Sequence, residues 1–206
     1  MFNRRNTLQA LVLLGWAAFA AFPLTASAEG EPPVIAAASD LKFAVTEIAV
    51  AFTAETGMEV KLSFGSTGNF ATQIREGAPF ELFMAADEKF VAQLHAEGLT
   101  RDEGALYAEG RVVIMVPHGS ALTPDENLDT LAAMLDAGTI TRFAIANPEH
   151  APYGLRAQEA LQHRGLWEKV QPHLVLGENV SQTAQFALSG NTASCCRRAK
   201  AWTGRH

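Results

Sequence analysis

Two segments of the chain lead from an apolar strand directly into a short, hydroxyl-bearing turn that opens a helix. Residues 34–40 place Ser39 at the first turn, and residues 60–69 place Ser66 and Thr67 between two glycines at the second. A helix start presents backbone N–H groups that have no partner within the helix, together with the positive end of the helix dipole. Each hydroxyl could be an ordinary cap, but together the two starts predict a cradle for a small oxyanion.

Other site chemistries fit the sequence less well. A nucleophile elbow needs Gly-x-Ser-x-Gly, but Phe64 stands where the first glycine belongs. The later histidines His150, His163 and His173 have no distinctive setting, and His150 is expected in a solvated loop. The chain contains neither a P-loop nor a dinucleotide-binding fingerprint, and its six histidines lack metal-ligand spacing. We therefore expect no enzyme, no cofactor and no free metal cation; a serine hydrolase using Ser39 or Ser66 is the alternative.

The elements that position these residues alternate between strand and helix along the body of the chain. Apolar runs predict strands at residues 34–38, 60–64, 80–86, 111–117, 142–146 and 174–176. Between them, apolar residues recur at helical spacing, as in the helix that Asp87 caps and in residues 128–135 and 180–188. This alternation predicts an α/β protein with largely parallel sheets.

Ligands of open α/β sheets bind beyond the carboxyl ends of strands, where helices begin. Two such junctions precede the strand at residues 111–117 and two follow it. They are Ala38-Ser39, Ser66-Thr67, Pro152-Tyr153 and Asn179-Val180. The grouping predicts two lobes, residues 29–112 and 113–192, each offering two helix starts to a shared cleft.

The N-terminal residues 1–28 read as a secretory signal peptide. Arg4 and Arg5 precede an apolar run at residues 8–24, and Ala26-Ser27-Ala28 is a small-residue cleavage site before Glu29. A membrane anchor is the weaker alternative, because the run is short and contains a proline. We expect an exported, periplasmic protein.

Charge is distributed unevenly along the chain. Six of the 16 basic residues lie at the two ends of the chain. The body therefore contains ten basic residues and all 22 acidic ones. A body of net charge −12 excludes nucleic acid as a partner held by the general field. An anion would have to be bound by local dipoles and hydrogen bonds.

The motifs around these junctions resemble those of the periplasmic molybdate-binding proteins, the substrate-binding components of molybdate ABC importers. The resemblance runs in the family's order from about residue 34 to residue 191. It rests on residues 36–39, 64–68, 73–83, 147–154 and 177–180. It implies a two-lobed periplasmic-binding-protein fold of type II, in which a mostly parallel sheet flanked by helices forms each lobe. It also implies a monomer that closes on molybdate or tungstate and hands it to a membrane permease.

The resemblance also assigns roles to individual residues. Ser39 would donate its hydroxyl and backbone N–H to the oxyanion, and Thr67 its hydroxyl, at a position where the family often has serine. Tyr153 and Val180 would each donate a backbone N–H, and Ser66 is a secondary candidate. Molybdenum would enter only as the oxyanion.

The resemblance ends near residue 192. Residues 193–206 form an aberrant tail that is rich in arginine, holds both cysteines and lacks the apolar strand expected next. A frameshift followed by an early stop, with the C-terminal portion missing, is the leading interpretation, and a divergent terminus is the alternative. Two other functions stay open: a binding protein for sulfate or a similar oxyanion, and a non-functional remnant that cannot close its first lobe.

Overall fold

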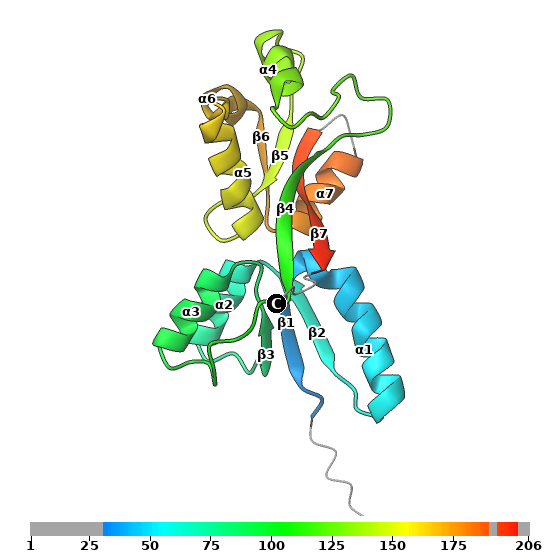
Figure 1. Cartoon of the computed structure of the whole chain (residues 1–206), viewed down its shortest axis with the longest axis vertical. Coiled ribbons are helices and arrows are strands. Elements are labelled where there is room, and N and C mark those ends of the chain that lie inside the picture. The colour runs from blue at the N-terminus through cyan, green and yellow to red at the C-terminus, as the bar shows by residue number, and fades with distance from the viewer. Residues whose placement is uncertain (1–30, 190–192, 202–206) are drawn as a thin grey trace, which may run out of the picture. The chain divides into compact units, whose positions relative to one another are not determined.

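Strands and helices alternate along the chain, and the strands form two sheets, as Figure 1 shows. The structure, a computed structural model, describes residues 31–189 and the backbone of residues 193–201. The predicted signal peptide therefore lies outside the described residues. Within them, the α/β class with mostly parallel pairing is confirmed.

The first sheet is entirely parallel and has the order β2-β1-β3. Its strands are β1 (Val34–Ala38), β2 (Lys61–Gly65) and β3 (Leu82–Met84). The central strand β1 ends in three buried alanines, whose small side chains let neighbouring elements approach closely. A 3₁₀ turn, Ser39–Leu41, leads from β1 into α1 (Lys42–Thr56). Gly57 ends this helix with a positive φ of 72°, a conformation that glycine adopts without strain.

Two further helices belong to this part of the chain. They are α2 (Thr67–Arg75) and α3 (Glu88–Ala96), which Figure 1 shows on the opposite flank of the sheet from α1. The predicted cap of α3 is confirmed, because the Asp87 side chain accepts a hydrogen bond of 3.0 Å from the Lys89 N–H.

The second sheet has the order β4-β7-β5-β6. Its strands are β4 (Ala108–Met115), β5 (Phe143–Ala146), β6 (Leu174–Gly177) and β7 (Ala193–Ala201). Its helices are α4 (Asp129–Asp136), α5 (Pro152–His163), α6 (Trp167–Val170) and α7 (Val180–Leu188), with a 3₁₀ turn at Gln171–His173. Sequence patterns predict α7 closely and the start of α5, whereas they do not reveal the single turn α6.

Two features of this sheet differ from the expectations. The predicted lobe boundary after residue 112 falls inside β4, and all of β4 pairs with β7. The tail also forms a strand although it lacks an apolar run: β7 pairs antiparallel with β4 and parallel with β5. Backbone N–H and C=O groups can pair whatever the side chains are, and β4 supplies partners along nearly all of β7, while β5 pairs only with Ala193 and Ser194.

The two sheets bury apolar side chains unequally. In the second, a large cluster surrounds Phe143 and Ile145 and includes Leu131, Leu161 and Val170. In the first, the buried cluster consists of Ala37, Ala38, Leu41 and Val45.

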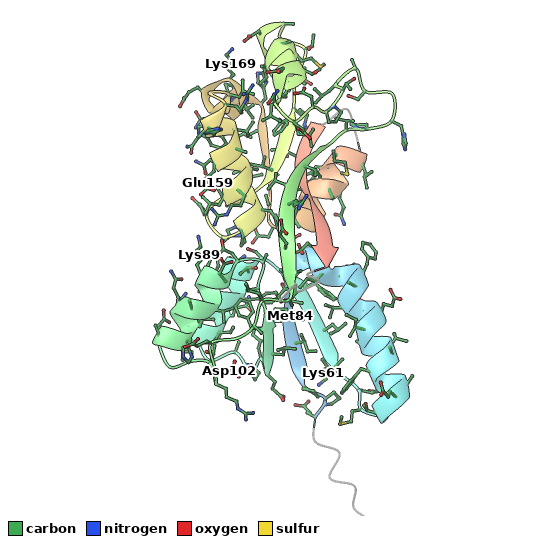
Figure 2. All side chains as sticks on the ribbon, in the orientation of Figure 1. Lys61, Met84, Lys89, Asp102, Glu159 and Lys169 are labelled. Atoms are coloured by element: carbon green, nitrogen blue, oxygen red, sulfur yellow. The ribbon has the colours of Figure 1, made fainter. Side chains whose placement is uncertain are left out.

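Helix α1 shows the consequence of the small first cluster. Val45 is buried, whereas Phe43, Ile48 and Val50 are mostly exposed. Figure 2 shows side chains extending from the outer side of α1, away from the sheet. Met84, labelled in the same view, belongs to β3. The first sheet thus has an apolar helix of which only a narrow stripe is covered.

Candidate functional site

The two hydroxyl-bearing turns lie next to each other at the end of the first sheet. Ala38, the last residue of β1, pairs in register with Gly65, the last residue of β2. Ser39 therefore begins its 3₁₀ turn beside Ser66 and Thr67 at the start of α2. All three serine and threonine side chains are buried. The strand pairing thus brings together two candidates that lie 28 positions apart in the sequence.

The second sheet places the other two predicted helix starts in the same way. Ala146 at the end of β5 pairs with Gly177 at the end of β6. Tyr153 is the second residue of α5, and Val180 is the first residue of α7. N–H groups in the first turn of a helix have no acceptor within that helix, so both positions can present a donor beyond the strand ends.

Hydrogen bonds join the helix starts of one sheet to those of the other. Ser181, in the first turn of α7, donates its hydroxyl to the Ser39 carbonyl at 2.9 Å. Its N–H donates to the Ser39 hydroxyl oxygen at 3.4 Å. On the other side, the Gly68 N–H of α2 donates to the His150 carbonyl at 2.9 Å, two residues before α5. We call this arrangement of four helix starts the junction.

The buried hydroxyls of the junction differ in whether they donate or only accept a hydrogen bond within the protein. The Thr67 hydroxyl oxygen accepts a hydrogen bond of 3.0 Å from the Ala86 N–H, so its own proton can go to another acceptor. Ser39 also only accepts through its hydroxyl, in the bond from Ser181. Ser66 instead donates its proton to the His150 carbonyl. Ser39 and Thr67 are therefore better placed than Ser66 to donate to an anion.

His150 differs from the expectation of a solvated loop residue. Its side chain is 18% exposed, and its Nδ1 lies 3.0 Å from the Ser66 hydroxyl oxygen. Its Nε2 lies 3.7 Å from Glu178 Oε1. The partners that bury His150 are 84 and 28 positions away, so no local pattern reveals them. Its place between two prolines, just before a predicted helix start, was the available signal.

Ser66, His150 and Glu178 have the residue types of a catalytic triad without its geometry. The Ser66 proton points at a backbone carbonyl, whereas a nucleophilic serine must give its proton to the imidazole.

No cluster of three or more metal-ligating side chains occurs among residues 31–189. The same part of the chain contains no helix that is long and apolar enough to cross a membrane.

The Tyr153 side chain points away from the strand ends, toward β4. A Cβ added at Gly110 would lie 2.5 Å from the Tyr153 hydroxyl. The ring borders a cavity of about 550 Å³ that Asp87 and Tyr107 also line. Burial raises the pKa of Tyr153 above its ordinary value, and the nearby Tyr107 and Asp87 raise it further. Tyr153 is thus a candidate donor at the junction through its backbone N–H and not through its side chain.

Comparison with known proteins places the chain in a family. Residues 33–195 match the bacterial extracellular solute-binding proteins. The chain is 35% identical over 169 residues to the molybdate-binding protein ModA of Azotobacter vinelandii, covering 82% of this chain and 65% of that protein. ModA of Rhodobacter capsulatus is 36% identical over 159 residues, covering 77% and 60% of the two chains.

Solved structures agree with the sequence relatives. The periplasmic molybdate-binding protein of Azotobacter vinelandii superposes with a TM-score of 0.70 at 29% identity, covering 81% of this chain and 71% of that one. The sulfate-binding protein SubI of Mycobacterium tuberculosis has a TM-score of 0.62 at 16% identity, covering 81% and 64%, and shares the fold. The chain spans less than two thirds of the length of the curated relatives described above. The chain belongs to the family of bacterial extracellular solute-binding proteins.

Proposed function

We propose that this protein binds molybdate or tungstate at the junction, in the periplasm, and delivers the anion to the permease of an ABC importer as a monomer. The observation that carries the proposal is the meeting of Ser39 and Thr67, with their protons available, with the starts of α5 and α7. The names of the relatives support the identity of the anion.

The mechanism is binding without chemistry. Ser39 and Thr67 would donate hydroxyl protons, and Tyr153 and Val180 backbone N–H groups, to the oxygens of one tetrahedral anion. Helix dipoles, rather than a counter-ion, would offset the charge. A site made only of donors rejects protonated phosphate, whose own proton would find no acceptor. The size of the ring of donors would separate molybdate from the smaller sulfate.

Isothermal titration calorimetry with a Ser39→Ala variant tests this assignment. We expect molybdate affinity to fall by about 1–3 kcal/mol, because a buried oxygen of the anion loses a donor. Ser63→Ala, on β2 of the same sheet, is the matched control and should bind as the unaltered protein does. Equal affinities for Ser39→Ala and the control would contradict the assignment.

A further inference from the structure

The start of α2 is capped by a residue of the other sheet. Its N-cap residue, Ser66, makes no side-chain cap of its own helix. Instead, the His150 carbonyl accepts hydrogen bonds from both the Ser66 hydroxyl and the Gly68 N–H. A Cβ at position 68 would lie 2.6 Å from that carbonyl oxygen, so the approach requires glycine. The backbone of His150 thus already ties α2 to the loop before α5.

The His150 imidazole faces an acceptor at each of its nitrogens. Ser66 has given its proton to the carbonyl, so its oxygen can only accept from Nδ1, 3.0 Å away. Nε2 faces the Glu178 carboxylate at 3.7 Å. A neutral imidazole has one donor and one acceptor, whereas an imidazolium has two donors. An imidazolium would therefore donate to Ser66 from Nδ1 and attract the Glu178 carboxylate at Nε2, at an ion-pair distance rather than a hydrogen-bond distance.

Glu178 is held in place by the first sheet. Its Oε1 accepts a hydrogen bond of 2.5 Å from Asn69 Nδ2 on α2, and this is the same oxygen that faces His150. Glu149, next to His150 in the chain, lies 3.4 Å from Asn147 Nδ2. The groups that face the imidazole are thus Ser66, the N-cap residue of α2, and Glu178 from the loop before α7, while Glu149 adjoins His150 in the same loop.

We propose that His150 is a positioning residue: together with Glu178 it forms a clasp on Ser66, Gly68 and Asn69 that holds the start of α2 against the second sheet. Protonation of His150 tightens this clasp. The consequence for the ligand rests on the proposed function. If the junction binds molybdate, a tighter clasp favours the closed arrangement, and the affinity rises as pH falls across the range in which histidine changes charge.

The first measurement needs no ligand. In NMR spectra recorded between about pH 8 and about pH 6, we expect the Gly68 amide shift to follow the titration of the His150 ring, which a His150→Gln variant identifies. In Glu178→Gln, which keeps an amide oxygen but loses the charge, the Gly68 shift should lose most of its pH dependence. His163→Gln, near the end of α5, is the matched control. Its Gly68 amide shift should depend on pH as it does in the unaltered protein.

The second measurement is the molybdate affinity at the two ends of this range. Because the Glu178 side chain is 58% exposed, we expect binding only about two- to fivefold tighter at pH 6 than at pH 8. His150→Gln should bind at both pH values with one affinity, since it retains hydrogen-bonding capacity without a titrating charge.

The two measurements separate the failure of the clasp from the failure of the proposed function. A Gly68 shift that ignores His150 overturns the clasp, whether or not molybdate binds. A Gly68 shift that follows His150 in a protein that binds no molybdate supports the clasp and contradicts the proposed function. Equal pH dependence of affinity in His150→Gln and the unaltered protein overturns the link between the clasp and the ligand.

Discussion

The first and second sheets are built by the same alternation of strand and helix, yet they are stabilised differently. The second sheet surrounds Phe143 with large buried side chains, whereas the first has a smaller cluster of alanines, Leu41 and Val45 and also buries Phe70 of α2 and Leu94 of α3. The first sheet makes polar contacts with the second through Ser39 and Gly68. Apolar burial is the dominant favourable contribution to folding, so most of the stability should reside in the second sheet. The order of the first should depend on the contacts across the junction.

The largest effect should come from the second core. Phe143→Ala removes a fully buried aromatic ring, and we expect it to lower the free energy of unfolding by about 3–5 kcal/mol. Leu41→Ala, the counterpart in the first core, should cost about 2 kcal/mol, because few buried neighbours surround it. Urea titrations followed by circular dichroism measure both. Equal losses for the two variants would contradict the proposed imbalance between the cores.

A smaller effect should come from Asp87, which links α3 to α5. Its carboxylate caps α3 and lies 2.9 Å from Arg156 Nη2 on the second sheet's helix. Asp87→Ala should destabilise the protein by about 1–2 kcal/mol, chiefly through loss of the cap. Asp87→Asn keeps the cap and loses only the ion pair with a half-exposed arginine, so it should cost about 1 kcal/mol or less. A larger loss in Asp87→Asn than in Asp87→Ala would refute this division of roles.

The last effect is absent at neutral pH and confined to alkaline pH. Burial raises the pKa of Tyr107 to about 12, and the pKa of Tyr153 is raised as well. Folding therefore favours the neutral phenols, and this stability is present below the unfolded value of about 10 and lost as pH rises toward about 12. The two are the only tyrosines in the chain, so tyrosinate absorbance follows them without background.

We expect the tyrosinate signal to appear only well above pH 10, close to the loss of folded structure. Tyr107→Phe should remove half of the signal. The remainder, from Tyr153, should still be delayed by burial, but by less than in the unaltered protein, because Tyr107 no longer raises the pKa of Tyr153. A signal that rises at pH 10 in protein that is still folded would show that neither ring is buried as described.

Local patterns predict those parts of the site that depend on local chemistry. Ser39 and Thr67 follow strands whose apolar runs are visible in the sequence, and Asn179 caps α7 through its own side chain. The fold class follows from the same alternation. The pairing of Ala38 with Gly65 then brings the two turns together, as expected for neighbouring parallel strands.

What the sequence could not predict depends on distant partners. The role of His150 comes from Ser66 and Glu178, which no spacing connects to it. Strand β7 forms chiefly because β4 offers backbone partners along it, with β5 pairing at its first two residues, so its small and charged residues give no apolar signal. The weak burial of α1 is likewise a property of the assembled sheet, because Phe43, Ile48 and Val50 are apolar and yet mostly exposed.

Thermal unfolding with and without anions tests the central claim most directly, because a ligand that binds only the folded state must raise its melting temperature. With molybdate at about a hundredfold excess over its dissociation constant, the stabilisation of about 2.7 kcal/mol predicts a rise of about 5–10 °C. Sulfate at the same concentration should produce almost none. Equal shifts with both anions, no shift with either, or the absence of a cooperative transition would contradict the account.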